Sequence, residues 1–519
     1  MSRPRTAVPI LHRRAEVIWG DGARRPDRVA RWAASAALLL SLVPLALVGA
    51  CPRDEEPAGE PKRLLADASW PNVVLISIDT LRPDHLSCYG YARSTSPNLD
   101  KLAGEGALFE QAVSSTSWTL PAHAALFTGL ADTVHGALDT DKALAEGHVT
   151  LAERLQAVGY TTAGFFSGPT LYPAYGLGQG FDTYVDCTSY AQLSAEEVSM
   201  PGIATGGPLQ RAAMADISSP RVFEAVHKWL ADGPRRPFFL FVHLYDCHFD
   251  FIPPAPYDRR FDPDYHGSVT GRDFIYDDTI NARMPKGDLA HLIALYDGEI
   301  AWTDAHVGKI VADLETHGLK DSALLIVLSD HGTEFFEHGQ KGHRHTLYDE
   351  VIRIPLLVRF PGRITPGLRL AGQVRIIDVA PTVLDLLGLT VPPELMGQTL
   401  VPLLEGRELA QENLAVSELF TMGRALRAFR RPDRKLIRQE QTGEAVAFHL
   451  ATDPAERNRL TDPSHIVVQA ALRDAEKAGK WLTQFRQLWP VPAVVPHLPE
   501  KVRERLQSLG YIGEEEKPK

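Results

Sequence analysis

Short, almost uninterrupted apolar runs alternate with helical stretches from residue 71 onward. The clearest apolar runs are 73–78, 238–242, 324–328 and 356–358. Strands that are apolar along their whole length are typical of sheets covered on both faces. We therefore expect an α/β fold, with a large mixed and mostly parallel sheet between two layers of helices.

The segments between these runs have the periodicity of amphipathic helices. It predicts helices over 97–106, 151–158, 222–230, 289–314 and 378–387, and residues 161–166 predict a further strand. Residues 251–288 are rich in Pro, Asp and Tyr, which is typical of a long surface loop or lid.

The character of the sequence changes after residue 405. Alternating segments rich in Arg, at 425–431 and 434–439, predict a short antiparallel sheet, and residues 447–450 predict its next strand. We therefore expect a catalytic domain over 71–405 and a smaller C-terminal α+β subdomain over 406–519.

Composition narrows the class of protein. The net charge of -11 over 519 residues argues against a nucleic-acid partner. It leaves an anionic substrate open, because a bound metal can outweigh the global field. The 4 cysteines are too few for a disulfide framework, and Cys88, Cys187 and Cys247 could form at most one bridge.

The N-terminal segment 1–51 has the pattern of a targeting sequence. Its apolar run, 32–50, follows a basic flank and ends in small residues before Cys51, which resembles a bacterial lipobox with a lipidated cysteine. The run is also long enough to be an uncleaved membrane anchor. Residues 52–70 predict a flexible linker. Both readings place the catalytic body on the periplasmic or extracellular side of a membrane.

Asp79 and Asp330 each end a buried apolar run, and His331 follows the second. The carboxyl ends of strands in such a sheet meet at one edge, where ligands bind. Buried carboxylates need a partner, so we expect them to bind a metal with His331. The alternative is that each caps a helix or pairs with an arginine such as Arg82. Mixed oxygen and imidazole ligands favour zinc or manganese over calcium.

Thr119 adds a hydroxyl just before Pro121 and a helix-like run. A metal-bound alcohol loses its proton more easily and becomes a nucleophile near neutral pH. A helix that begins here would also direct backbone N–H groups at an anion. The alternative is that Thr119 is a plain N-cap residue.

Several collinear motifs resemble the sulfatase family of the alkaline phosphatase superfamily. They are Asn72 to Tyr91, Thr119-x-Pro121-x-His123 with Leu126-x-Thr128-Gly129, Ser329-Asp330-His331-Gly332, Tyr348 to Pro355, Asp378-x-x-Pro381-Thr382 and Asp453 to Asn458. The resemblance implies an enzyme that hydrolyses sulfate or phosphate esters with one divalent metal.

Two positions depart from that family's usual pattern. Sulfatases convert a cysteine or serine at the nucleophile position into formylglycine, and Thr119 is not a substrate for that conversion. His123 replaces the signature arginine. Relatives with threonine here act on phosphorus, so we expect a phospho-threonine intermediate and favour phosphoesters, with an arylsulfatase-type activity as the alternative.

The resemblance also implies substrate-binding residues. His248 resembles the family histidine that contacts the anionic oxygens, and His123 is expected to help it. A Gly-rich loop holds three histidines, His338, His343 and His345, beside Lys341 and Arg344. They could bind the anion, protonate the leaving group or hold a second metal, and the alternative is a plain solvated loop. His243 lies near His248, but the sequence leaves open which face of the sheet its side chain points to. The spacing Asp-x-x-x-His occurs only away from strand-like runs, so we expect a single metal.

Two other classes of function remain. A phosphoethanolamine-type transferase would use lipid head groups, but such enzymes usually carry several membrane spans. A non-catalytic binding protein would not need Asp79, Thr119, Asp330 and His331 together. The expected substrate is an anionic ester of a small molecule, a lipid or a glycan.

Overall fold

The computed structural model describes residues 69–189, 217–409, 411, 413–421, 423–499 and 503. Residues Arg63–Lys519 form one compact unit. The predicted targeting segment 1–51 and most of the predicted linker 52–70 lie outside the described residues. No helix in the described part of the chain has the length and hydrophobicity that a bilayer crossing requires.

The centre of the fold is an eight-stranded sheet with the order β10-β2-β9-β6-β1-β5-β3-β4. Only β9 runs against the others. The strands are β1 (Asn72–Ile78), β2 (Ala107–Val113), β3 (Thr161–Phe166), β4 (Thr183–Asp186), β5 (Phe238–Leu244), β6 (Ala323–Ser329), β9 (Arg353–Arg359) and β10 (Leu368–Arg375). This confirms the predicted mixed, mostly parallel sheet.

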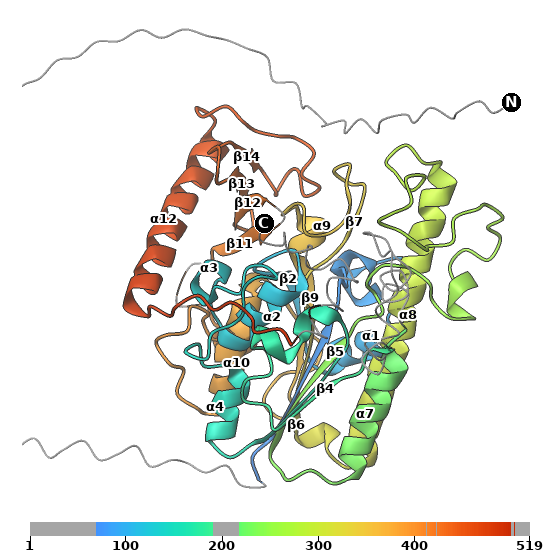
Figure 1. Cartoon of the computed structure of the whole chain (residues 1–519), viewed down its shortest axis with the longest axis vertical. Helices are drawn as coiled ribbons and strands as arrows, with labels where there is room; N and C mark the ends of the chain where they lie inside the picture. Colours follow the sequence, from blue (N-terminus) through green and yellow to red (C-terminus); the bar gives the residue numbers. More distant parts are fainter. Residues whose placement is uncertain are drawn as a thin grey trace, which may run out of the picture. The chain divides into compact units, whose positions relative to one another are not determined.

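Helices cover both faces of this sheet (Figure 1). One face is covered by α2 (Thr119–Thr128), α4 (Leu151–Ala157) and α10 (Val379–Leu386), and the other by α1 (Pro97–Glu105), α7 (Ser219–Ala231) and α8 (Lys286–Thr316). Successive residues of β1 alternate between the two cores, so Val73 and Leu75 face the first and Val74 and Ile76 face the second.

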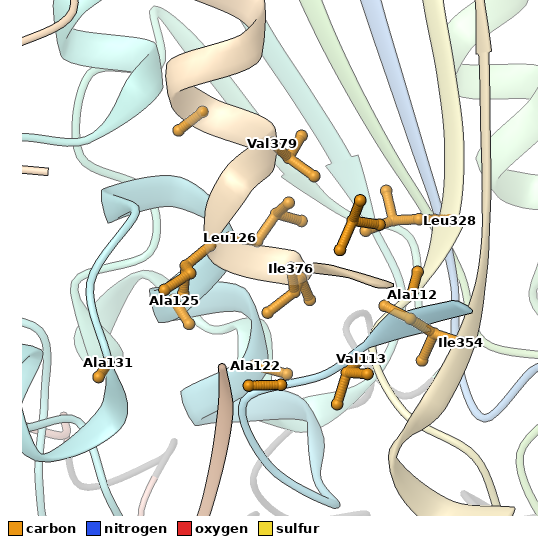
Figure 2. Close-up of a cluster of buried hydrophobic side chains, with 14 of the residues drawn as sticks. Ala112, Val113, Ala122, Ala125, Leu126, Ala131, Leu328, Ile354, Ile376 and Val379 are labelled. Atoms are coloured by element: carbon orange, nitrogen blue, oxygen red, sulfur yellow. The ribbon is translucent and has the colours of Figure 1, made fainter. Parts of the chain in front are cut away.

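Small residues let α2 lie close to the sheet. Figure 2 shows Ala122 and Ala125 of this helix in the same buried cluster as Val113 and Ile376. The short 3-10 turn η8 (Ile376–Asp378) leads into α10 at this place. All residues of α2 are buried, and such close packing holds a helix rigidly. The N-terminus of α2 therefore has a fixed position relative to the ends of the strands.

A four-stranded antiparallel sheet follows in the C-terminal part, with the order β11-β12-β13-β14. Its strands are β11 (Ala415–Thr421), β12 (Arg424–Arg430), β13 (Lys435–Gln439) and β14 (Ala445–Phe448), and α12 (Ile466–Leu488) packs against it. This confirms the predicted small sheet. It also adds β11 and α12, which the sequence analysis did not predict.

The remaining elements are short. They are α3 (Asp132–His135), α9 (Asp349–Ile352), α11 (Val401–Leu404), β7 (Glu334–Phe335), β8 (Lys341–Gly342), and the 3-10 turns η1 (Pro83–His85), η2 (Ser87–Tyr89), η3 (Pro169–Leu171), η4 (Pro173–Tyr175), η6 (Tyr257–Arg259) and η7 (Lys320–Ser322). Residues 251–285 form an irregular segment that contains only η6. Cys88, Cys187 and Cys247 are free thiols.

Candidate active site at the carboxyl edge of the sheet

Two buried carboxylates meet where neighbouring strands end. β1 and β6 pair in parallel with Ile78 opposite Ser329, so Asp79 and Asp330 follow side by side. The imidazole Nε2 of His331 lies 3.7 Å from Asp79 Oδ1 and 3.5 Å from Asp330 Oδ2. All three side chains are fully buried. The strand ends therefore gather these residues at one edge of the sheet, as predicted.

Thr119 is the first residue of α2 and brings its hydroxyl to this cluster. Oγ1 donates a hydrogen bond to Asp79 Oδ2 at 3.3 Å and lies 3.4 Å from His331 Nε2. The side of Thr119 that remains exposed is small, because the residue is 7% accessible. The N-terminus of α2 lies at the same place, and the positive end of the helix dipole favours a bound anion.

The orientation of His331 is set by the backbone beside it. Nδ1 lies 2.9 Å from the carbonyl oxygen of Gly332, and a carbonyl only accepts, so this nitrogen carries the proton. Nε2 then presents its lone pair to Asp79 and Asp330. A carbonyl that fixes the tautomer in this way is typical of histidines that bind metals.

The electrostatics favour a cation between the two carboxylates. Burial and the charge of Asp330 raise the pKa of Asp79 well above its ordinary value, against the hydrogen bond from Thr119. Asp79 Oδ1 and Asp330 Oδ2 are buried without a hydrogen-bond partner among the described residues. Ligands about 2.1 Å from one ion lie roughly 3.0–3.5 Å apart at octahedral or tetrahedral angles, close to the separations seen here. The donor set of Asp79, Asp330, His331 and Thr119 thus fits a divalent metal.

His123 lies under the site rather than at its open side. Its ring is fully buried. Nδ1 lies 2.9 Å from the carbonyl oxygen of Thr119, one turn earlier in α2, and Nε2 lies 3.0 Å from Ser77 Oγ on β1. Both nitrogens are therefore used inside the protein, and the contacts suit a residue that positions Thr119 better than one that binds substrate oxygens.

His248 and His343 come to the site from two loops. The ring centroid of His343 is 4.6 Å from that of His331 and 5.0 Å from that of His248. Burial lowers the pKa of His248 to about 3, and burial together with the neighbouring imidazoles lowers the pKa of His343 well below its ordinary value. Both rings are therefore neutral at physiological pH until a negative charge binds beside them.

The other loop residues have different neighbours. Arg344 stacks its guanidinium on Trp118, 4.2 Å from the ring centroid, so it lies beside the residue before Thr119. Lys341 donates to the carbonyl oxygens of Asp277 and Ile280 at 2.9 and 2.8 Å. His345 Nε2 lies 3.1 Å from Glu334 Oε2. The structure therefore brings His343 and Arg344 towards the site, while Lys341 and His345 hold the loop to its surroundings.

Sequence reasoning missed Ser77 and left His243 open. Both lie inside apolar strands, at paired positions of β1 and β5, and both point to the α2 face, where they contact His123. A polar residue that interrupts a buried apolar run was the available signal, because such a residue needs a specific partner.

Known protein families match most of the described chain. Residues 71–389 match the sulfatase family, and residues 336–478 match the C-terminal region of N-sulphoglucosamine sulphohydrolase.

The names of individual relatives refer to sulfate chemistry in some cases and to phosphorus chemistry in others. A multifunctional alkaline phosphatase superfamily protein of Trinickia caryophylli is 28% identical over 65% of this chain and 77% of its own length. Human arylsulfatase A is 29% identical over 66% of this chain and 69% of its own. The phosphonate monoester hydrolase of Agrobacterium radiobacter superposes with a TM-score of 0.64 at 23% identity, covering 83% of this chain and 98% of that one. The chain belongs to the sulfatase family of the alkaline phosphatase superfamily and is a hydrolase of sulfate or phosphate esters.

Proposed function

We propose that this hydrolase uses the unmodified hydroxyl of Thr119 as its nucleophile and acts on phosphoesters in preference to sulfate esters. The observation that supports the proposal is the position of Oγ1 at the N-terminus of α2, 3.3 Å from Asp79 and 3.4 Å from His331 Nε2. A threonine at this position has a hydroxyl for direct attack and no route to the formylglycine of sulfatases.

The reaction would take place in two displacements. Thr119 Oγ loses its proton along its hydrogen bond to Asp79 and forms a bond to phosphorus, while the ester's alcohol leaves with the electron pair of the broken P–O bond and takes up a proton from solvent. Water then attacks the phospho-threonine, which releases phosphate and restores the hydroxyl. Asp79, Asp330, His331 and Thr119 would hold a divalent metal, which would lower the pKa of the Thr119 hydroxyl and supply positive charge to the anionic oxygens.

The chain's own residues have three further tasks. The hydrogen bond to Asp79 orients the Thr119 hydroxyl and directs its proton away from the substrate. The N-terminus of α2, where the N–H groups of Thr119 and Leu120 begin the helix, would stabilise negative charge on the phosphoryl oxygens. His343 lies next to His331, and His248 lies next to His343, so both are placed to meet those oxygens or the leaving group.

The test uses the purified protein, freed of metal and then supplied with Zn²⁺, Mn²⁺ or Ca²⁺. We expect turnover of 4-nitrophenyl phosphate or phenylphosphonate esters with Zn²⁺ or Mn²⁺, and slower turnover of 4-nitrophenyl sulfate. Thr119→Ala should remove turnover, whereas Thr119→Ser keeps a hydroxyl and should retain part of it. Mass spectrometry of quenched enzyme should find phosphate on Thr119. Faster hydrolysis of the sulfate would reverse the substrate preference, and an unchanged rate in Thr119→Ala would exclude this nucleophile.

We further propose that the enzyme is tethered on the outer side of the cytoplasmic membrane. The support is the sequence alone: the basic flank, the apolar run 32–50 and Cys51. Intact-mass analysis of protein from bacterial membranes should find a mature N-terminus at Cys51 that carries lipid. An N-terminus before residue 51 without lipid, on protein recovered from the membrane, would indicate an uncleaved anchor instead.

A further inference from the structure

His243 is a fully buried imidazole beside the proposed metal site. It lies on β5, where the register pairs it with Ser77 of β1. Its ring makes an edge contact with the ring of His123, with centroids 4.9 Å apart. The strand register therefore places His243 between α2 and the carboxylates that follow β1 and β6.

The hydrogen bonds of His243 fix which nitrogen carries the proton. Nδ1 lies 2.6 Å from the carbonyl oxygen of Ser167, which can only accept, so Nδ1 is the donor. A neutral imidazole carries a single N–H, and here that N–H is on Nδ1. Nε2 therefore has a free lone pair, and His243 has the same donor pattern as His331.

That lone pair has no hydrogen-bond partner among the described residues. Nε2 lies 3.6 Å from Asp79 Oδ2, the oxygen that accepts from Thr119. A buried lone pair without a hydrogen-bond donor is unfavourable in itself. A cation between the two atoms would remove the conflict, and 3.6 Å is a separation at which two ligands can share one ion.

His123 also lies close to the carboxylates, with Nδ1 3.7 Å from Asp330 Oδ2, but it has no free lone pair. Its Nδ1 donates to the Thr119 carbonyl, so its Nε2 accepts from the Ser77 hydroxyl. It thus has no lone pair left for a metal. The ligand atoms of His123, His243 and Asp330 form one close group and those of Asp79, Asp330 and His331 form another, so His243 is linked to the metal site through the shared Asp330 and through its approach to Asp79. Because His123 supplies no lone pair, the first group adds only His243 to the shared carboxylate. These contacts favour one ion with His243 in its shell over a separate second ion.

We propose that His243 Nε2 is a direct ligand of the same divalent metal as Asp79, Asp330, His331 and Thr119. This inference rests on the metal site of the proposed function and extends its ligand set. A second imidazole makes the site softer, so it discriminates against Ca²⁺ and in favour of Zn²⁺, Mn²⁺ or Co²⁺.

The experiment counts imidazoles on the bound metal and needs no turnover. The full-length protein is loaded with one equivalent of Mn²⁺, and pulsed EPR measures the ¹⁴N couplings of directly bound imidazole. We expect two coordinated imidazoles in the unaltered protein, one in His243→Gln and two in His123→Gln. The His123→Gln variant is the matched control, because it removes an adjacent buried ring that donates no lone pair to the site.

Binding titrations with Zn²⁺ and Ca²⁺ alone give a second readout. The loss of a direct ligand should weaken Zn²⁺ binding by at least the 10–100-fold known for changes around metal ligands. Ca²⁺ binding should change much less, because the glutamine of His243→Gln can offer its amide oxygen in place of the imidazole nitrogen, and Ca²⁺ prefers oxygen ligands. Equal losses for both ions would contradict the proposal.

The possible failures are separable. Stoichiometric metal with a single imidazole in the unaltered protein would overturn the role of His243 and leave the proposed metal site intact, with no variant needed. If His123→Gln lost one bound imidazole and His243→Gln did not, the second imidazole ligand would be His123 and not His243. Failure of the protein to bind any divalent ion would overturn both this inference and the metal-dependent mechanism. An active Thr119→Ala variant would affect only the nucleophile.

Discussion

Arg430 and Asp349 form a buried two-point ion pair between β12 and the first residue of α9. Arg430 Nε and Nη2 donate to the two carboxylate oxygens of Asp349 at 3.0 and 2.8 Å. Lys435, on the neighbouring strand β13, donates to the same carboxylate at 2.9 Å. Although burial alone would raise it, these cations hold the pKa of Asp349 far below its ordinary value. The small sheet is thus joined by charge to the segment that follows the site loop.

Removing one member of this pair should destabilise the protein strongly. Arg430→Met leaves the carboxylate buried with less compensation, and such changes cost about 3 kcal/mol or more. Chemical denaturation should show this loss in the free energy of unfolding. Arg424→Met is the control, because Arg424 lies on the same strand with an exposed side chain. Equal effects of the two substitutions would mean that the ion pair contributes nothing specific.

Gly332 should tolerate no side chain. A Cβ built on it would lie 2.1 Å from the carbonyl oxygen of Glu350, and the carbonyl of Gly332 itself fixes the His331 tautomer. Gly332→Ala must therefore move the backbone beside His331, and we expect at least tenfold weaker Zn²⁺ binding together with lower thermal stability. Isothermal titration and thermal unfolding measure these two effects.

Gly104→Ala is the matched control for this substitution. Gly104 lies in α1, where a Cβ meets nothing within 4 Å. It should leave Zn²⁺ affinity unchanged and stabilise the helix slightly, because alanine has the higher helix propensity. If Gly332→Ala bound Zn²⁺ as tightly as Gly104→Ala, the close approach of position 332 to the carbonyl oxygen of Glu350 would not matter for the metal site.

Ser77→Ala should lower kcat without changing metal content. The substitution removes the donor to His123 Nε2, and His123 in turn holds the first turn of α2 through the Thr119 carbonyl. One lost hydrogen bond is worth about 1 kcal/mol, so kcat should fall roughly fivefold to tenfold with KM little changed. Steady-state kinetics and metal analysis check this.

A threonine at the other end of α2 provides the comparison for Ser77. Thr128 Oγ1 donates to the carbonyl oxygen of Ala124, far along the helix from the nucleophile. Thr128→Val should therefore leave kcat unchanged even if it lowers stability. A loss of metal in Ser77→Ala would contradict a purely positioning role for His123.

The protein should lose stability as the pH falls below about 6.5, in part through His135. Burial lowers the pKa of this histidine to about 3, so between these pH values the unfolded chain binds a proton that the native state does not. His135→Asn keeps an acceptor for the N–H of Ala137 and cannot titrate. Between pH 7.5 and 5.5 the variant should lose about 1 kcal/mol less than the unaltered protein.

Denaturation midpoints over this pH range measure the difference. His465→Asn, at an exposed histidine that caps α12, should follow the unaltered protein. A variant at position 135 with an unchanged pH dependence would show that His135 is protonated in the native state.

The sequence by itself determined the sheet and the contents of its edge. Apolar runs specify strands covered on both faces, and parallel strands bring the residues that follow them to one edge, so Asp79, Asp330 and His331 could be grouped before any coordinates. The predicted start of a helix at Thr119 followed from local signals of the same kind. Such features need only a residue's immediate neighbours.

Only the tertiary structure decided what depends on distant partners. β2 and β10 escaped prediction because polar residues interrupt them near the rim of the sheet, where one side is less buried. The face of His243 follows from its register with Ser77, and its protonation follows from the carbonyl of Ser167. Whether an imidazole offers a proton or a lone pair is set by hydrogen bonds that residues far along the chain supply, and no local pattern encodes them.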